Sequence, residues 1–195
     1  MLVTDDRLLE GRDVIGLARA AERGGVTAIQ LRLKSATPRE LVDLARTLVA
    51  ALAVPVLVND RPDVALAAGA AGVHLGPDDL PVSLARRIAP PGFVIGASVG
   101  SVDEAELAVE ADYWGIGPWR ETTTKGDAGV GLGVDGFSRL RRLSGGQPCM
   151  AIGRVLPADV AAVRAAGGAG VAVASGILGA EDVEEAARSY RRADV

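Results

Sequence analysis

The chain has almost no cysteine, no excess of positive charge and no long hydrophobic run. Its single cysteine, Cys149, excludes an internal disulfide framework and is typical of a reducing compartment. A net charge of −4 gives no reason to expect binding to nucleic acid or to an anionic membrane. No apolar run approaches the ~20 residues of a membrane span, and the N-terminus carries acids where a secretory signal needs a basic patch. We therefore expect a soluble cytoplasmic protein that binds neither nucleic acid nor membrane; the pattern leaves open whether it forms a homo-oligomer.

Aromatic residues and lysines are scarce as well. Aromatic residues make up only 3% of the chain against 49% hydrophobic residues, so the core must consist mainly of Ala, Val, Leu and Ile. Of the 21 lysines and arginines, only Lys34 and Lys125 are lysines. A basic residue placed only for surface charge would almost always be arginine in this chain. These two positions therefore need an explanation of their own.

Short β-branched segments alternate along the chain with longer Ala/Leu/Arg-rich segments of helical period. Strands are predicted at 2–4, 27–32, 55–58, 72–75, 93–97, 112–117, 148–152 and 170–174, and helices near 11–23, 37–53, 62–69, 81–89, 101–110, 134–143, 157–166 and 180–192. Segments such as "PVLV" and "GVAVA" are continuously apolar, as expected of strands buried on both faces. Eight successive βα units in about 200 residues predict an α/β fold, a compact (β/α)8 TIM barrel forming one domain over residues 1–195.

The main alternative is an open, doubly wound sheet. That fold usually has a glycine-rich turn after its first strand, and "VTDDRLLEG" has none. A formal G-x-G-x-x-G match, "GLGVDG" at 131–136, follows a polar loop rather than a strand. We interpret it as a chance match in a chain with 25 glycines, and the closed barrel is preferred.

Polar side chains collect at the C-terminal ends of the predicted strands, where barrels of this kind place their active sites. They are Gln30, Arg32, Lys34, Asn59, Asp60, Asp78, Asp79, Ser98, Thr122, Thr124, Lys125, Arg154 and Ser175. The opposite ends offer mostly Gly, Pro and Ala. Because solubility alone would place polar residues at both ends, this asymmetry predicts a functional site.

The residue types at these ends suit a phosphorylated ligand. Arg32, Lys34 and Lys125 are cations, and several hydroxyl groups lie beside them, which is a donor set for phosphate or pyrophosphate. Asp60 and Asp79 follow neighbouring strands and suit Mg²⁺, which takes one or two protein carboxylates and leaves its other positions to water and phosphate. Zinc is disfavoured, because it prefers His and Cys and the chain has one of each. Lysine supplies a compact charge on a flexible stem, whereas arginine is a rigid fork.

Some of these residues have simpler interpretations. Asp60, Asp78 and Asp79 could cap the helices that follow them. His74, within "GVHLG", is interpreted as a packed strand residue rather than a catalyst.

The expected locations of the cysteine, the tryptophans and a threonine cluster follow from their positions relative to the predicted strands. Cys149 and Trp114 are expected in the core, whereas Trp119 lies at the edge of the site, where it could stack on a flat ring. The threonines 122–124 lie in a loop of roughly 16 residues, longer than the usual two to six residues, which favours a function for that loop.

Eight segments, taken in order, resemble the thiamine phosphate synthase family across nearly the whole chain. They are "LVTDDRLL", "GGVTAIQLRLKS", "VPVLVND", "GVHLGPDDLP", "IGAS", "YWGIGPWRETTTK", "AIG" and "GVAVASGI". The resemblance implies a (β/α)8 barrel and a Mg²⁺-dependent transfer between two small molecules, an aminopyrimidine diphosphate and a carboxylated thiazole phosphate.

The resemblance also implies roles for individual residues. The pyrimidine diphosphate would be bound by Gln30, Leu31, Arg32, Leu33, Lys34, Asn59, Ser98 and Lys125; Mg²⁺ by Asp60 and Asp79; and the thiazole phosphate by Thr122, Thr123, Thr124, Ala174 and Ser175. Among them, Arg32, Lys34, Ser98 and Lys125 would be catalytic, because they would stabilise charge on the departing pyrophosphate.

The chain departs from the family pattern at several positions. Leu33 and Arg61 stand where the family commonly has acids, Pro77 replaces a glutamine, and Gly100 replaces a histidine. Arg154 replaces the second glycine of a Gly-Gly pair that approaches the thiazole phosphate. Its side chain could block that approach, or its guanidinium group could bind the phosphate itself.

Two other functions remain open at this point. A thiazole tautomerase shares the fold and works by proton transfer on the thiazole phosphate alone, but it would need neither both aspartates nor the T-x-T-K segment at 122–125. A catalytically silent barrel that binds a phosphorylated ligand is the second alternative, and the substitutions Pro77 and Arg154 motivate it.

Overall fold

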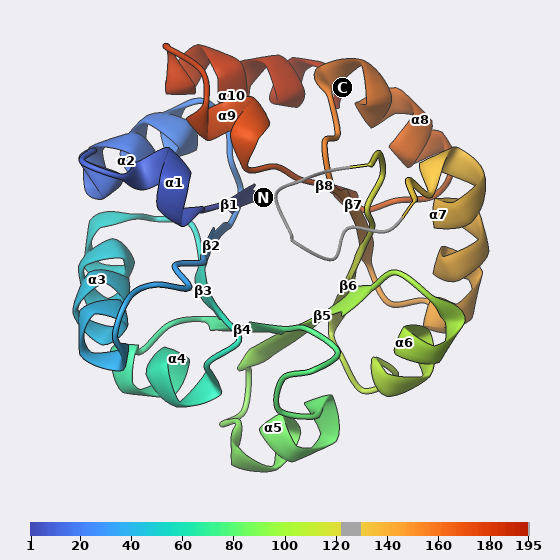
Figure 1. Cartoon of the computed structure of the whole chain (residues 1–195), viewed down its shortest axis with the longest axis horizontal. Coiled ribbons are helices and arrows are strands. Elements are labelled where there is room, and N and C mark those ends of the chain that lie inside the picture. Colours follow the sequence, from blue (N-terminus) through green and yellow to red (C-terminus); the bar gives the residue numbers. More distant parts are fainter. Residues whose placement is uncertain (122–129, 195) are drawn as a thin grey trace.

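The structure is a computed structural model that describes residues 1–121 and 130–194 (Figure 1). Its eight parallel strands follow one another in sequence order within one sheet. They are β1 (Leu2–Val3), β2 (Ile29–Leu31), β3 (Val56–Asn59), β4 (Gly72–Leu75), β5 (Val94–Val99), β6 (Tyr113–Ile116), β7 (Cys149–Ile152) and β8 (Gly170–Ala172). A parallel bridge between Leu2 and Val173 joins the last strand to the first. The predicted closed barrel is confirmed.

Helices surround the strands as a ring (Figure 1). They are α1 (Asp6–Leu9), α2 (Val14–Arg23), α3 (Pro38–Ala51), α4 (Pro62–Ala68), α5 (Val82–Ile88), α6 (Val102–Leu107), α7 (Gly133–Arg141), α8 (Val160–Ala165), α9 (Ser175–Leu178) and α10 (Val183–Arg192), with 3-10 turns at Arg142–Ser144 and Pro157–Asp159. The sequence pattern did not predict α1 and α9, which are single turns that follow β1 and β8. Both lie at the end of the barrel where the polar residues collect. No helix in the described part of the chain is long and apolar enough to cross a bilayer.

Side-chain caps fix where two of the strand-to-helix connections become helix. The Thr37 hydroxyl accepts a hydrogen bond from the Glu40 amide, and the Glu40 carboxylate accepts one from the Thr37 amide at 2.8 Å, which forms a capping box at the start of α3. Ser101 caps α6 by accepting from the Glu104 amide at 3.2 Å. Each cap contributes about 1 kcal/mol, and together they fix where α3 and α6 begin after β2 and β5.

The apolar core lies mainly between the strands and the helices. Trp114 is fully buried there and donates its indole N–H to the Ala108 carbonyl at 2.9 Å. Cys149 is also buried, so both residues are in the core as predicted. The prediction for Trp119 is wrong: it is buried and packs edge-on against Phe137, with ring centroids 5.9 Å apart, so its faces are not available to a ligand.

Candidate functional site

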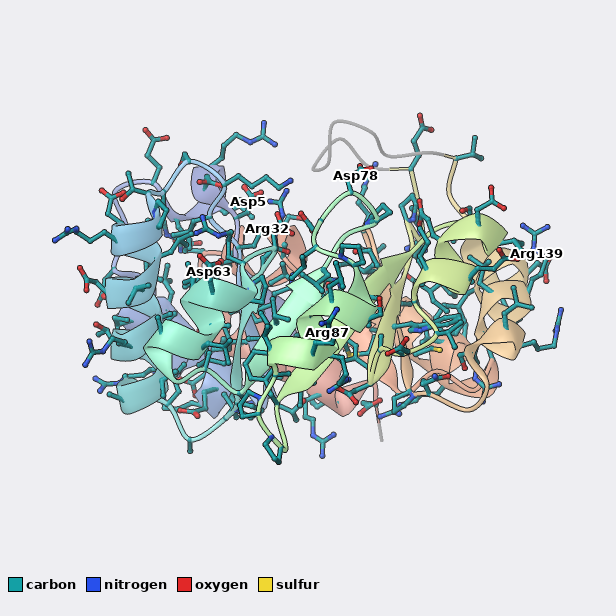
Figure 2. All side chains as sticks on the ribbon, turned by 90° about the horizontal axis from the view of Figure 1, so that it is seen from below. Asp5, Arg32, Asp63, Asp78, Arg87 and Arg139 are labelled. Carbon is teal, nitrogen blue, oxygen red and sulfur yellow. The ribbon has the colours of Figure 1, made fainter. Side chains whose placement is uncertain are left out.

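A cavity of about 780 Å³ opens at the C-terminal ends of the strands. Figure 2 views the barrel from the side, with Arg32 and Asp5 next to each other and Asp78 toward the same end of the barrel. Many of the predicted site residues line the cavity: Arg32, Lys34, Asn59, Asp60, Asp79, Ser98, Arg154, Ala174 and Ser175. Four further predicted site residues lie outside the described residues: Thr122, Thr123, Thr124 and Lys125. The barrel therefore gathers side chains from most of its strands around one cavity.

Residues 30, 31 and 33 do not line this cavity. Gln30 is buried and donates from Nε2 to Oδ1 of Asn59 at 2.6 Å, so it orients a residue that does line the cavity. Leu31, the next residue on the strand, is fully buried in the hydrophobic core, and Leu33 packs against the same core. Because successive side chains of a strand point to opposite faces, the side chains of the two leucines are not placed to contact a ligand.

Arg32 is held in place by residues that the sequence analysis missed. Its guanidinium Nη1 lies 3.2 Å from Oδ2 of Asp5, and both side chains are almost completely buried. The Thr4 hydroxyl accepts from the Arg32 amide at 2.7 Å and donates to the Arg32 carbonyl at 3.0 Å. The motif that could have revealed this support is "TDD", residues 4–6. It follows the first strand in the same way that "ND" follows the third.

Asp6 fixes the segment that carries Lys34. Its carboxylate accepts hydrogen bonds from the amides of Lys34 and Ser35, at 2.9 and 3.0 Å, and from the Ser35 hydroxyl. Burial opposes ionisation of this carboxyl, but the hydrogen bonds outweigh it and lower the pKa of Asp6 to about 2. The loop after β2 is therefore tied to the start of α1.

Lys34 points toward a pair of aspartates. Its Nζ lies 3.8 Å from Oδ2 of Asp60. Burial, together with the hydrogen bond and negative charge of Asp79, raises the pKa of Asp60 to about 6, although the charges of Lys34 and Arg32 oppose this shift. Two carboxyl groups in this position repel each other when both are ionised, so they favour a shared proton or a shared cation.

The backbone holds these two carboxyl groups away from the helices that follow them. Asp60 has a left-handed φ of 63°, and its amide donates to the His74 carbonyl at 2.8 Å. Asp79 accepts from the Gly76 amide at 2.6 Å. The N-cap residues of α4 and α5 are Arg61 and Pro81, neither with a side-chain cap, so the interpretation of the aspartates as helix caps is wrong.

Arg154 adopts a backbone conformation that favours glycine. Its φ is 52°, in the left-handed region. Its Nη1 donates to the Glu121 carbonyl at 3.2 Å, and its own carbonyl accepts from Arg120 at 3.0 Å. Arg154 is one of the residues that line the cavity, and it is exposed. The substitution therefore adds a cation beside the cavity at a position shaped for glycine.

His74 was interpreted as a packed strand residue, and it is buried. Both of its ring nitrogens also contact hydroxyl groups. Its Nε2 lies 3.0 Å from the Ser98 hydroxyl, and its Nδ1 lies 2.9 Å from the Tyr113 hydroxyl. Ser98 lines the cavity, so His74 connects the barrel interior to the candidate site.

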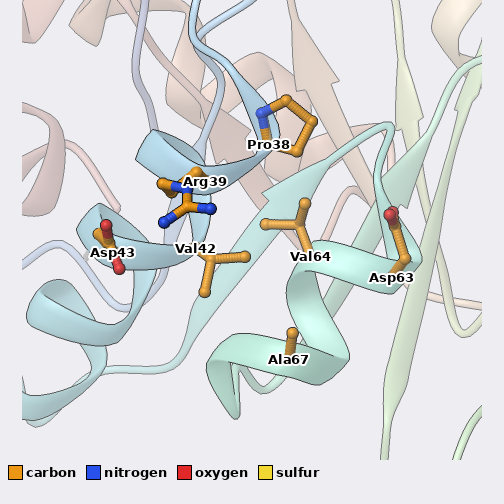
Figure 3. A pocket seen from close by; sticks show the side chains of 7 residues that line it. All are labelled: Pro38, Arg39, Val42, Asp43, Asp63, Val64 and Ala67. Atoms are coloured by element: carbon orange, nitrogen blue, oxygen red, sulfur yellow. The ribbon is translucent and has the colours of Figure 1, made fainter.

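A second hollow, of about 350 Å³, lies on the outside of the barrel between α3 and α4 (Figure 3). Its lining consists of Pro38, Arg39, Val42, Asp43, Asp63, Val64 and Ala67. The carboxylate of Asp63 is paired with Arg61 at 2.6 Å, and the pair is exposed to solvent. This hollow does not contain the strand-end residues on which the functional prediction depends.

The chain matches a family model described as thiamine monophosphate synthase over residues 1–177. It is 48% identical to the thiamine-phosphate synthase of Methanoculleus marisnigri and 45% identical to that of Azorhizobium caulinodans; each match covers 97% of this chain and 92% of the relative. Among solved structures, a thiamine phosphate pyrophosphorylase from Pyrococcus furiosus is 37% identical with a TM-score of 0.86, over 99% of this chain and 93% of that one. A 3-hexulose-6-phosphate synthase, 19% identical with a TM-score of 0.70, shares the fold. The predicted resemblance is confirmed: the chain belongs to the thiamine monophosphate synthase family, transferases of thiamine biosynthesis.

Proposed function

We propose that the cavity joins an aminopyrimidine diphosphate to a carboxylated thiazole phosphate with the help of Mg²⁺, and that pyrophosphate and carbon dioxide are released. The observation that carries this proposal is the grouping of Asp60 and Asp79 with Lys34 and Arg32 at one side of the cavity. The carboxylates suit a divalent cation, and the two side-chain cations suit the diphosphate that the cation would accompany.

The donor set fits Mg²⁺. Asp60 and Asp79 supply carboxylate oxygens, the ligand type that this ion prefers, and Mg²⁺ typically keeps positions for water and substrate phosphate. Among the described residues, no group of three or more His, Cys, Asp or Glu side chains is placed to hold a metal ion. When bound, Mg²⁺ would neutralise negative charge on the diphosphate.

The protein's own cations would stabilise the leaving group. The bond between the pyrimidine methylene carbon and the diphosphate oxygen breaks, and its electron pair leaves with pyrophosphate. The electron-rich aminopyrimidine stabilises the cation that remains, and the thiazole nitrogen then uses its lone pair to form the new C–N bond. The carboxyl group of the thiazole leaves as carbon dioxide, and the ring carbon that keeps the electron pair takes up a proton. Arg32, already oriented by Asp5, acts without reorganisation at that moment, and Lys34 adds its positive charge beside Asp60. Lys125, outside the described residues, stays a prediction for the same role.

The remaining cavity residues are assigned to the two substrates. Asn59, oriented by Gln30, and Ser98 would hold the pyrimidine diphosphate. Ala174, Ser175 and the threonines 122–124 would hold the thiazole phosphate. We assign Arg154 to that phosphate as well, because this residue lines the cavity and is exposed. Cytoplasmic location and self-association stay predictions from the sequence.

Calorimetric titration with the pyrimidine diphosphate, with and without Mg²⁺, tests this function against the two alternatives. The proposal expects metal-dependent binding and formation of thiamine phosphate once the thiazole phosphate is added. A tautomerase would bind the thiazole phosphate without metal and form no joined product. A silent binding protein would bind a ligand and leave both substrates unchanged.

A further inference from the structure

A chain of three polar side chains runs from the barrel interior to the cavity. Tyr113 on β6 contacts Nδ1 of His74 on β4, and Nε2 of His74 contacts Ser98 on β5, at 2.9 and 3.0 Å. Tyr113 and His74 are buried, whereas Ser98 is half-buried and lines the cavity. The three residues therefore lead from a water-poor interior to the place where a substrate would bind.

Two glycines make room for this chain. Gly96 on β5 pairs with His74 on one side and Tyr113 on the other. A Cβ atom at Gly96 would lie 2.1 Å from Cζ of Tyr113, so any side chain there would displace the ring that reaches His74. A Cβ at Gly115, which pairs with Ser98, would lie 3.2 Å from Cε1 of His74. The backbone of β5 and β6 is therefore shaped around the three side chains.

The direction of the hydrogen bonds decides what Ser98 presents to a ligand. If the Tyr113 hydroxyl donates to Nδ1, then Nε2 of neutral His74 carries the proton and donates to the Ser98 oxygen, which leaves the Ser98 proton for the cavity. In the opposite arrangement Ser98 donates to Nε2 and presents only lone pairs. A phosphate group needs a donor, so only the first arrangement suits the diphosphate of the proposed function.

The surroundings of Tyr113 favour the first arrangement. Burial raises the pKa of the Tyr113 hydroxyl, so it keeps its proton. A buried hydroxyl proton needs an acceptor, and among the described residues the hydrogen-bond partner of this hydroxyl is Nδ1 of His74.

We propose that Tyr113 holds His74 in the neutral tautomer with the proton on Nε2, and that His74 thereby positions the Ser98 hydroxyl as a donor to the substrate diphosphate. His74 and Tyr113 are positioning residues, because they act through Ser98. The part that concerns the diphosphate rests on the proposed function; the tautomer does not.

The tautomer can be measured directly, because His74 is the single histidine of the chain. In protein labelled with ¹⁵N-histidine, NMR should give one protonated Nε2 and one unprotonated Nδ1 signal at neutral pH. Tyr113→Phe, which keeps the ring, should shift the population toward the other tautomer. Tyr190→Phe is the matched control, because the Tyr190 hydroxyl donates to the Val155 carbonyl at 2.9 Å and should leave the histidine signals unchanged. A proton on Nδ1 in the unaltered protein would overturn the proposal, whether or not any variant folds.

Binding of inorganic pyrophosphate in the presence of Mg²⁺ tests the link to Ser98. Tyr113→Phe should raise the dissociation constant about tenfold, the size expected for a weakened hydrogen bond to an anion. The same substitution in a Ser98→Ala background should have no further effect, because the donor it orients is gone. Equal effects in both backgrounds would refute the positioning role. Unaltered protein that does not bind magnesium pyrophosphate would contradict the proposed function and the role of Ser98 with it, while the NMR result still decides the tautomer.

Discussion

The cavity at the strand ends and the outer hollow between α3 and α4 contain similar residue types in different environments. In the cavity, Arg32 and Asp5 form an ion pair whose side chains are 11% and 8% exposed. Beside the outer hollow, Arg61 and Asp63 form one whose side chains are 39% and 64% exposed. Water screens the second pair, and such surface pairs contribute little, whereas charges held in a water-poor site act strongly on a ligand. Burial and fixed orientation, more than the charges themselves, distinguish the two places.

The proposed metal ligands should give the largest difference between the two regions. Asp79→Asn is expected to lower turnover at least a hundredfold and to shift the Mg²⁺ titration, because a preorganised contact to developing charge is worth about 3 kcal/mol. Turnover at increasing Mg²⁺ concentration is the measurement. Asp43→Asn, in the lining of the outer hollow, is the control and should behave as the unaltered protein. An unchanged metal titration for Asp79→Asn would remove this residue from the site.

The two ion pairs should differ in their effect on folding. Asp5→Asn keeps an oxygen that can cap α1, but it leaves the Arg32 guanidinium group buried without its counter-charge, which should cost about 3 kcal/mol of unfolding free energy. Asp63→Asn should cost less than about 1 kcal/mol. Urea unfolding of both variants compares them directly. Similar losses for the two would mean that burial does not distinguish the pairs.

The aspartate pair should make the stability of the metal-free protein depend on pH. Because the pKa of Asp60 is raised to about 6, the folded protein keeps a proton that the unfolded chain releases near pH 4. The unfolding free energy should therefore fall as pH rises from about 4 to about 6, by roughly 2 kcal/mol. Melting curves of metal-free protein in this window test it, with Asp60→Asn as the variant that loses the dependence. Mg²⁺ should raise the melting temperature more at pH 7.5 than at pH 5; equal shifts at both values would argue against a metal bound by this pair.

The barrel and the gathering of Arg32, Lys34, Asp60 and Asp79 were predictable from the sequence, because parallel strands bring their C-terminal ends to one edge. The supports of these residues were not. Asp5 reaches Arg32 across 27 positions of the chain, and Tyr113 reaches His74 across 39, and both contacts depend on register between strands. The misassignment of Trp119 has a similar cause, since its burial depends on contact with Phe137 of α7.

Substitutions of Arg154 should give the smallest effects. They separate the backbone strain at this position from the contribution of its guanidinium group to binding. Its left-handed φ of 52° costs a residue with a Cβ about 1 kcal/mol, which glycine avoids. Arg154→Gly should therefore raise the unfolding free energy by up to about 1 kcal/mol, whereas Arg154→Ala keeps the strain and should not. Both variants lose the guanidinium group equally, so both should raise the KM for the thiazole phosphate if that group binds it. Urea unfolding and steady-state kinetics of the pair separate the two contributions. A KM that stays constant in both variants would show that Arg154 occupies a glycine position without replacing its function.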